Sequence, residues 1–559
     1  MQLERPWYKS WPGYLAKEAN VAPEPLYSVL TSSAMRFGSR PCLAYQGRTM
    51  NYADVDDLSS KFASALLGLG LNKGDRVAIF SPNTPQFVIS YFGILKAGGV
   101  VVPCSPLYKE RELENQLRDS GSSIVIAAND VVRGNDLYAS LEGCRQRLKL
   151  AHVITASVTD YLPGIKRALA GFAKVKKVER HDTLAFVDLV RRSRPAQSPA
   201  PVNPNEDVAV LQYTGGTTGT SKGAMLTHYN LLAAAAIGAM SLPLTERDVS
   251  LAVLPLFHIF GMTACLNAPL LTGGEVVLLP RFDVREVMHT IQKEKVTCFC
   301  GVPTMYIAIN NHQDVARFEL KTVRVAFSGG AALPLAVSKK FNELTGGKLV
   351  EGYGLTETAA VGSTNPFEGG LPKEGSIGIP FPSTDARVVS LEDPGRLLPP
   401  GEVGELALKG PQVMKGYWQN DEETRLVLKD GWLLTGDIAK MDDDGYFFIV
   451  DRKKDMIDVG GLKVYPREVE EVLFEHPSVK EAAVIGVPDE YRGETVKAFV
   501  VLKDPGSKEK AEAEITAYCK ERLANYKVPR RYEFVQDLPK TLVGKVLRRK
   551  LKEGTATSR

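Results

Sequence analysis

Residues 213–228 read YTGGTTGTSKGAMLTH, and this glycine- and hydroxyl-rich stretch is the most informative in the chain. It follows the β-branched run 208–213 and precedes apolar residues of helical period. Glycines let the backbone turn tightly with its N–H groups facing inward, the hydroxyl groups add donors, and Lys222 adds a positive charge. Such a loop can hold a polyphosphate. Ser221 stands where the Walker pattern has a glycine, which argues against a P-loop NTPase.

The sequence on both sides of this loop alternates short apolar runs with segments of helical period. Buried strands are predicted at 76–80, 122–127, 208–213, 275–280 and 322–330. This alternation predicts an α/β fold with doubly wound, largely parallel sheets. After a glycine-rich break at 445–461 the pattern changes and predicts a small α+β module, with helices at 466–476 and 511–524 and strands at 482–487 and 497–502.

Composition limits the function classes. The chain has 559 residues, which predicts two to four domains at roughly 150 residues each. A net charge of +4 is too small to indicate a nucleic-acid-binding protein, and it suits anionic small molecules. The seven cysteines are scattered, without the spacing of a zinc site or a disulfide framework. With no apolar signal segment at the N-terminus, these features predict a cytoplasmic protein.

The segment 160–180 is amphipathic, and its basic residues outnumber its acidic ones. A basic amphipathic helix can lie on an anionic membrane surface, although such helices more often cover a core with a charged outer face. Peripheral contact with the inner face of a membrane is therefore left open by the sequence, and so is a homodimer.

Six further motifs follow the glycine-rich loop in a fixed order. They are LPLFHIFG (254–261), SGGAAL (328–333), EGYGLTET (351–358), GWLLTGD (431–437), DRKKDMIDVGGLKVYPREVE (451–470) and LPKTLVGKVLRR (538–549). Together with the loop they resemble the adenylate-forming superfamily of acyl-CoA synthetases, luciferases and peptide-synthetase adenylation domains. The resemblance extends from about residue 51 to the last twenty residues.

The resemblance implies both a domain plan and a reaction. The plan is a large N-terminal domain, 1–453, of doubly wound sheets plus a β-barrel-like subdomain, followed by a small mobile α+β domain, 454–559. The reaction uses ATP and Mg²⁺ to convert a carboxylic acid into an acyl-adenylate, with release of pyrophosphate. Coenzyme A then attacks the activated carbonyl, and acyl-CoA and AMP leave.

Residue roles carry over onto matching positions. Tyr353 is expected to stack on adenine, Asp437 to accept the ribose hydroxyls and Glu357 to hold Mg²⁺. Thr356 is expected to touch the α-phosphate, and Lys545 to bridge the substrate carboxylate and that phosphate. The catalytic set is Lys545, Thr356 and Glu357. The positions expected to bind ATP or AMP are Thr214, Thr217, Thr218, Ser221, Lys222, Gly329, Gly330, Ala331, Glu351, Gly352, Tyr353, Gly354, Thr356, Asp437, Arg452 and Lys545.

The resemblance also assigns the acyl pocket, the hinge and the coenzyme A site. The expected pocket residues are His258, Phe260, Gly261, Met262, Val302 and Gly330, with His258 shaping the wall beside the carboxylate. Lys454 matches the hinge position, and Gly460, Gly461 and Lys463 match the region that binds coenzyme A. Arg548, Arg549 and Lys550 are expected at the surface or on coenzyme A phosphates.

The sequence of the loop is most similar to that of medium- and long-chain fatty acid–CoA ligases. An aromatic-acid CoA ligase and an acyl-AMP ligase that loads a carrier protein are the alternatives. Some long-chain enzymes carry a tryptophan gate where Gly261 and Met262 stand here, so such a gate is not expected. An inactive homologue is disfavoured because Lys222, Glu357, Asp437 and Lys545 are all present.

Overall fold

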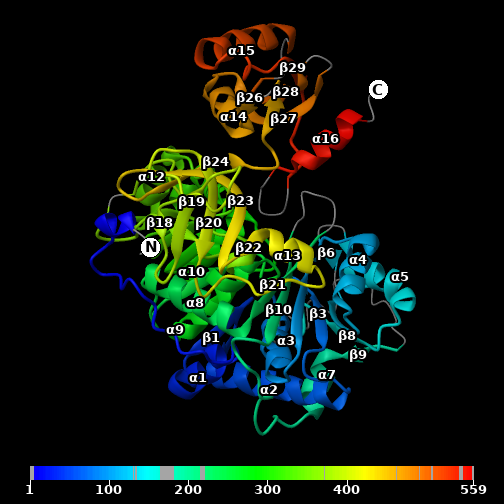
Figure 1. Cartoon of the computed structure of the whole chain (residues 1–559). Helices are drawn as coiled ribbons and strands as arrows, with labels where there is room; N and C mark the ends of the chain where they lie inside the picture. The colour runs from blue at the N-terminus through cyan, green and yellow to red at the C-terminus, as the bar shows by residue number, and fades with distance from the viewer. Residues whose placement is uncertain are drawn as a thin grey trace.

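The computed structural model describes residues 5–129, 131–132, 135–163, 182–214, 221–370, 372–460, 462–489, 492–504, 508–540 and 546–556. Most of the basic segment 160–180 lies outside these ranges. Figure 1 shows a large body formed by the first part of the chain and a smaller module, coloured orange and red, above it.

The body contains a nine-stranded sheet whose centre is parallel. Its order is β18-β17-β16-β15-β14-β12-β13-β1-β2. The pairs from β1 to β16 along this order are parallel, and the outer strands β2, β17 and β18 are antiparallel to their neighbours. The bounds are β1 (Pro41–Tyr45), β2 (Arg48–Asn51), β12 (Val249–Ala252), β13 (Glu275–Leu278), β14 (Cys298–Gly301), β15 (Val325–Ser328), β16 (Lys348–Tyr353), β17 (Ser363–Thr364) and β18 (Ile379–Pro380).

A second sheet of eight strands has the order β21-β11-β10-β4-β3-β5-β8-β9. From β10 to β9 its neighbouring strands are parallel, whereas β11 and β21 add an antiparallel edge. The bounds are β3 (Arg76–Phe80), β4 (Val100–Cys104), β5 (Ile124–Ala128), β8 (His152–Ala156), β9 (Leu184–Ala185), β10 (Val208–Tyr213), β11 (Gly223–Thr227) and β21 (Gly416–Tyr417). These strands confirm the predicted doubly wound α/β body.

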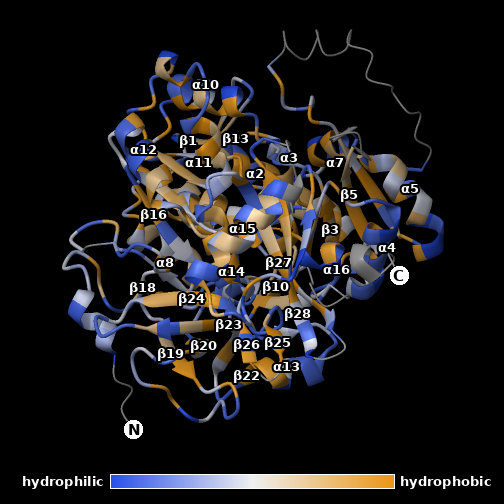
Figure 2. Ribbon diagram, turned by 90° about the horizontal axis from the view of Figure 1, so that it is seen from above, coloured by the Kyte–Doolittle hydropathy of each residue, from blue (hydrophilic) through white to orange (hydrophobic). Residues whose placement is uncertain are grey.

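Helices join the two sheets into one core. Every residue of α3 (Pro85–Lys96) is buried, and α2 (Tyr52–Gly68) packs against it. Side chains of both sheets and of these helices form one hydrophobic cluster, and Figure 2 shows the apolar strands inside the molecule. Further α-helices in the described part of the body are α1 (Ser28–Phe37), α4 (Glu110–Ser120), α5 (Leu137–Leu148), α7 (Phe186–Arg192), α8 (His228–Ser241), α9 (Ala268–Thr272), α10 (Val284–Glu294), α11 (Pro303–Asn310), α12 (Leu335–Thr345) and α13 (Asp421–Val427).

The helical stretch expected after the glycine-rich loop begins some residues after the loop ends. The apolar residues after the glycine-rich loop do not begin a helix, because 223–227 form strand β11, which pairs antiparallel with β10. Helix α8 starts only after Thr227, whose hydroxyl accepts a hydrogen bond from the Asn230 backbone in a capping box. Strands β10 and β11 are therefore the two paired strands that the loop connects.

A third sheet is antiparallel throughout. Its strands are β19 (Asp385–Val389), β20 (Gly404–Lys409), β22 (Leu428–Lys429), β23 (Trp432–Met441) and β24 (Phe447–Arg452). The resemblance implies a β-barrel-like subdomain beside the doubly wound sheets, and this antiparallel sheet is the candidate for it. Strand β24 is the last element of the body, and in Figure 1 it leads directly toward the upper module.

The C-terminal module has a sheet and core of its own. Its sheet order is β26-β25-β28-β27, with β29 paired to β28. The bounds are β25 (Ile457–Val459), β26 (Leu462–Val464), α14 (Pro466–Glu475), β27 (Val479–Asp489), β28 (Gly493–Leu502), α15 (Lys508–Arg522), β29 (Arg531–Phe534) and α16 (Arg548–Ala556). A separate hydrophobic cluster links these elements except α16, whose Leu551 packs with residues of β27 and β28 in a second cluster. These clusters confirm the predicted small α+β module.

No helix within the described ranges has both the length and the apolar character needed to cross a membrane.

Candidate active site

The glycine-rich loop is closed at its base by hydrogen bonds between its two ends. The Thr214 N–H donates to the carbonyl of Lys222 at 2.9 Å, and the Ser221 hydroxyl donates to the carbonyl of Thr214. Thr217 and Thr218 lie outside the described residues. The hairpin therefore holds Thr214, Ser221 and Lys222 together, as the sequence predicts for a phosphate-binding loop.

Lys222 lies in a cluster of charged and aromatic groups. Its ammonium group pairs with Glu423 of α13 and lies 5.3 Å from the ring centroid of Tyr417. The Tyr417 hydroxyl donates to Glu357 Oε1 at 2.7 Å. The loop lysine and the carboxylate expected to hold Mg²⁺ are thus separated by one tyrosine side chain.

The pairing of Lys222 with Glu423 leads to a prediction for ATP binding. Phosphate oxygens that take Lys222 must displace the Glu423 carboxylate, and both side chains are partly exposed, at 23% and 28%. Replacing Glu423 by glutamine is expected to lower the KM for ATP up to about fivefold, the size of a partly exposed ion pair. Steady-state kinetics at varied ATP check this, with Glu422→Gln on the same helix as the control. A raised KM would show instead that Glu423 supports the nucleotide site.

A second group of candidate residues lies where strands β15 and β16 end. Gly329 and Gly330 follow β15, and Gly330 has φ +85°, a conformation that favours glycine. A Cβ atom at Gly329 would lie 3.3 Å from the Phe260 ring, and one at Gly330 would lie 3.6 Å from Val302. The structure therefore brings Gly329, Gly330, Phe260 and Val302 together, and Ala331 continues the same turn.

Glu351 and Gly352 lie in strand β16, and Gly354 follows it directly. Burial raises the pKa of Glu351 to about 7, while a hydrogen bond from the Leu333 backbone and the charge of Arg467 act in the opposite direction. Thr356 and Glu357 form the short 3₁₀ turn Thr356–Thr358 beyond this strand. The carboxyl edge of the parallel sheet thus carries the whole EGYGLTET motif, at the place where α/β proteins bind ligands.

Tyr353, Asp437 and Arg452 form a connected polar group. The Tyr353 hydroxyl donates to Asp437 Oδ2 at 2.6 Å, and Arg452 Nε pairs with Asp437 Oδ1 at 3.1 Å. Asp437 and Arg452 are facing residues on the paired strands β23 and β24. Burial raises the pKa of Tyr353, as does the nearby carboxylate. The three residues assigned to adenine and ribose therefore lie side by side.

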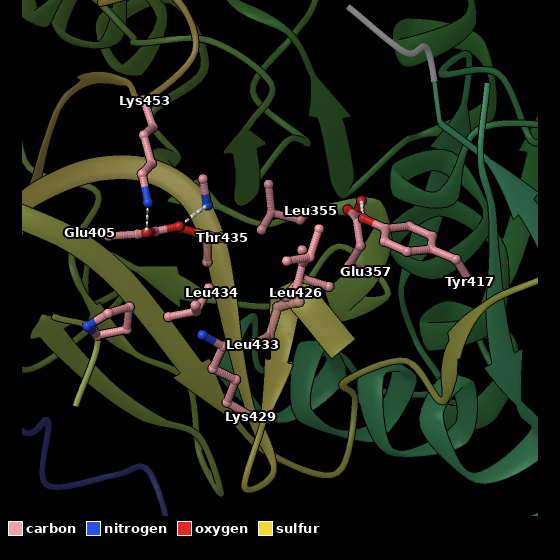
Figure 3. Close-up of a pocket in the computed structure, with 13 residues that line it drawn as sticks. Leu355, Glu357, Glu405, Tyr417, Leu426, Lys429, Leu433, Leu434, Thr435 and Lys453 are labelled. Atoms are coloured by element: carbon pink, nitrogen blue, oxygen red, sulfur yellow. Dashed lines mark hydrogen bonds and ion pairs between the residues drawn. The ribbon is translucent and has the colours of Figure 1, made fainter. Parts of the chain in front are cut away.

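A cavity of about 360 Å³ opens beside Glu357 and Tyr417. Figure 3 shows Glu357 and Tyr417 on one side and the ion pair between Lys453 and Glu405 on the other, with Leu355 between them. Lys453 Nζ lies 2.8 Å from Glu405 Oε2, and the other oxygen of this carboxylate accepts the Gly436 N–H at 3.0 Å. Lys453, which directly follows β24, is thereby fixed to the body beside the cavity.

The remaining acyl-pocket candidates, His258, Gly261 and Met262, differ in their contacts and burial. His258 Nδ1 accepts the Phe260 N–H at 3.2 Å, so its ring is held beside the pocket wall. A Cβ atom at Gly261 would lie 2.3 Å from the carbonyl oxygen of Pro255, so close backbone packing alone requires glycine there. Met262 is fully buried in the main core.

The hinge and coenzyme A candidates lie beyond the body. Lys454 is in the turn after β24, which the Asp455 N–H closes by donating to the Arg452 carbonyl at 3.0 Å. Gly460 and Lys463 lie on the exposed hairpin between β25 and β26. Gly461 and Lys545 lie outside the described residues.

Comparison with known families decides the classification. A family model described as AMP-binding enzyme matches residues 30–418, and one described as AMP-binding enzyme C-terminal domain matches residues 468–545. The chain belongs to the AMP-binding enzymes. A curated long-chain-fatty-acid–CoA ligase of Bacillus subtilis is 45% identical over 99% of this chain and 98% of its own length. One from Escherichia coli is 39% identical over the same shares.

Solved structures of AMP-binding enzymes share the fold. An anthranilate CoA ligase in complex with anthranoyl-AMP has a TM-score of 0.84 at 31% identity, with 96% of this chain and 98% of that one covered. A Mycobacterium tuberculosis fatty acyl CoA synthetase has a TM-score of 0.73 at 30% identity, with 96% and 99% covered. The resemblance that the ordered motifs indicate is confirmed.

The donor set of this AMP-binding enzyme fits Mg²⁺ only together with phosphate oxygens. No cluster of three or more His, Cys, Asp or Glu side chains that could hold a metal occurs in the described part of the chain. Mg²⁺ is usually bound through one or two carboxylates plus substrate phosphates. Glu357 supplies one such carboxylate, and it lies near Lys222, the lysine expected to bind the phosphates.

Proposed function

We propose that this enzyme activates a long-chain fatty acid with ATP and transfers the acyl group to coenzyme A, giving acyl-CoA, AMP and pyrophosphate. The observation that carries this proposal is the 45% identity, over 99% of the chain, to a long-chain-fatty-acid–CoA ligase. Two sets of contacts support it: Tyr353 and Arg452 both contact Asp437, and Tyr417 lies between Glu357 and Lys222. Medium-chain acids fall within the same proposal.

In the first half-reaction the enzyme's groups hold the nucleotide and stabilise charge. Tyr353 lies against adenine, and Asp437 exchanges the Tyr353 hydroxyl for the ribose hydroxyls while Arg452 keeps the carboxylate oriented. Thr214, Ser221 and Lys222 take the β- and γ-phosphates, with Thr217 and Thr218 as further donors. Mg²⁺ held by Glu357 would neutralise the departing pyrophosphate. Lys545 draws the carboxylate and the α-phosphate together.

In the second half-reaction a thiol must reach the carbonyl that Lys545 has been facing. We propose that the boundary lies at 453/454 and that residues 454–559 rotate about Lys454 between the two steps. Such a rotation must break contacts across the junction, among them the hydrogen bond that the Arg467 N–H donates to Asp451 Oδ2 at 2.7 Å. After rotation, Gly460, Gly461 and Lys463 would line the path of coenzyme A.

Pyrophosphate exchange with a panel of acids tests the substrate class. Exchange is expected to depend on added acid and to be fastest with straight-chain fatty acids. The pocket residues His258, Phe260 and Val302 would surround the first carbons of the chain. A preference for benzoate-type acids would favour the aromatic-acid alternative, and exchange without any acid would reject the proposal. Thioester formation on free coenzyme A separates the enzyme from an acyl-AMP ligase that loads a carrier protein.

Two finer points belong to the same proposal. Peripheral contact with an anionic membrane surface rests on the basic segment 160–180, which suits delivery of a lipidic acid. Flotation with vesicles rich in anionic lipid checks it, because binding should weaken as salt is raised. A homodimer stays a prediction, which the mass in solution measures.

A further inference from the structure

Asp119, the last residue but one of helix α4, is connected to both strands that carry the glycine-rich loop. Its Oδ2 accepts the Tyr213 hydroxyl at 2.5 Å, and Tyr213 ends β10, directly before the loop. Its backbone carbonyl accepts the Trp418 Nε1–H at 3.1 Å. The Trp418 N–H donates to the carbonyl of Gly223 at 2.8 Å, and Gly223 begins β11, directly after the loop.

The two aromatic side chains pack closely around the base of the loop. Tyr213 is only 8% exposed, so its hydroxyl needs a partner inside the protein. Burial and the Asp119 carboxylate raise the pKa of Tyr213, which keeps the hydroxyl protonated as a donor. A Cβ atom at Gly223 would lie 3.2 Å from the Tyr213 ring and 3.4 Å from the Trp418 Cβ. Glycine at 223 therefore lets both side chains approach the hairpin.

One route from Asp119 leads through Trp418 to the groups expected to bind Mg²⁺ and phosphate. Trp418 directly follows Tyr417 in the chain. The Tyr417 hydroxyl donates to Glu357 at 2.7 Å, and its ring centroid lies 5.3 Å from the Lys222 ammonium group. Fixing Trp418 at its ring and at its backbone restricts the backbone that places Tyr417, and hence the spacing of Glu357 and Lys222.

A second route from Asp119 leads through Tyr213 into the loop itself. Thr214 directly follows Tyr213, and its N–H donates to the carbonyl of Lys222 at 2.9 Å. The carbonyl of Thr214 accepts the Ser221 hydroxyl. The position of the Tyr213 side chain therefore influences the described residues at both ends of the loop.

Helix α4 by itself disfavours an aspartate at 119. The residue stands in the last turn, where the partial negative charge of the helix end repels a carboxylate. Alanine also has the higher helix propensity. Asp119 is exposed, so it adds no apolar burial to the core. What its side chain contributes is the contact with Tyr213, at the base of the loop.

We propose that Asp119 is a positioning residue for ATP binding, which it serves by holding Tyr213 and Trp418 at the two ends of the glycine-rich loop. It acts through these two side chains and not by contact with the nucleotide. The inference rests on the proposed function, since it assumes that Thr214 and Lys222 bind the β- and γ-phosphates. It adds a residue of α4, outside every motif of the sequence, to the groups that determine ATP affinity.

Asp119→Ala tests this role, because it removes the carboxylate and keeps the backbone carbonyl that Trp418 uses. The Kd for ATP with Mg²⁺, measured by titration calorimetry, is expected to rise about three- to tenfold, the size of one hydrogen bond, while the Kd for AMP stays within about twofold. AMP lacks the two phosphates that the loop binds. In steady-state kinetics the KM for ATP should rise by the same factor, with the KM for the fatty acid unchanged.

Further variants separate positioning from folding. Tyr213→Phe keeps the ring and should show the same selective loss of ATP affinity, also if Asp119→Ala fails to fold. The double variant should show no additional loss, because either single change breaks the same contact. Asp119→Asn keeps an oxygen acceptor and should recover most of the affinity. Glu110→Ala on the same helix is the matched control, since its ion pair with Arg147 is exposed.

Unchanged ATP affinity in Asp119→Ala would overturn the inference. Equal losses for ATP and AMP would also overturn it, because Asp119 would then support the fold of the whole nucleotide site. Additive effects of Asp119→Ala and Tyr213→Phe would show that the two residues act separately, with the same consequence. These three results leave the proposed function standing. Acid-independent pyrophosphate exchange by the unaltered enzyme would instead reject the proposed function, and with it this inference.

Discussion

Lys545→Ala is expected to lower the rate of acyl-adenylate formation by roughly 10²–10³-fold, the usual cost of removing one preorganised group that stabilises transition-state charge. The ammonium group would sit between two anions that repel each other, the carboxylate and the α-phosphate. Its loss leaves that repulsion uncompensated while the other nucleotide contacts remain. ATP–pyrophosphate exchange with a long-chain acid measures the effect.

The same variant should leave the second half-reaction nearly intact. Acyl-adenylate supplied directly should still react with coenzyme A at close to the normal rate. Lys550→Ala is the matched control, because Lys550 is an exposed lysine on the same terminal segment. Equal loss of both half-reactions in Lys545→Ala would contradict the assignment, and so would normal exchange.

Much of the architecture could be predicted from local patterns. Strands such as β3 and β5 are short apolar runs between amphipathic helices, and burial on both faces accounts for their composition. Helix α14 and strands β27 and β28 could likewise be predicted, because the spacing of apolar residues changes after the break at 445–461. Ordered motifs further predicted that Tyr353 and Asp437 serve one nucleotide, and the structure places them in contact.

Other features depend on contacts between distant residues. A short apolar run such as 223–227 is compatible with strand or helix by period alone, and pairing with β10 and β21 decides for a strand. The ion pair between Lys222 and Glu423 joins residues 201 positions apart. The sequence around a glutamate on a helix surface does not predict such a partner. Gly261 illustrates the same limit, since a motif position assigned to substrate is required by packing against Pro255.

The residues missed around the site are those that hold the groups already predicted. Tyr417 is hydrogen-bonded to Glu357, and Glu405 forms an ion pair with Lys453 beside the expected hinge. Each belongs to the third sheet or to the edge strand β21, which lies far along the chain from the glycine-rich loop. An ordered set of motifs indicates which residues meet the ligand, but the residues that orient them are found only from the folded geometry.

Lys454→Pro is expected to separate the two half-reactions in the opposite sense to Lys545→Ala. Proline fixes φ near −65° and restricts the preceding residue, so the backbone at 453–454 loses the freedom that rotation requires. Adenylate formation should be retained within about threefold, because it needs only one orientation of the C-terminal module. Thioester formation should fall by at least about a hundredfold, since the module cannot withdraw Lys545 and admit the thiol.

Lys454→Ala isolates the backbone effect, because it removes the same side chain and leaves the hinge free to rotate. Single-turnover measurements that follow pyrophosphate release and acyl-CoA formation in one reaction give both rates for each variant. Accumulated acyl-adenylate in Lys454→Pro, with normal turnover in Lys454→Ala, is the expected pattern. If both steps slow equally in the proline variant, or if the alanine variant shows the same block, the hinge does not lie at Lys454. The anchoring of Lys453 by Glu405 favours the expected result, because it holds the body side of the junction still while the residues after it turn.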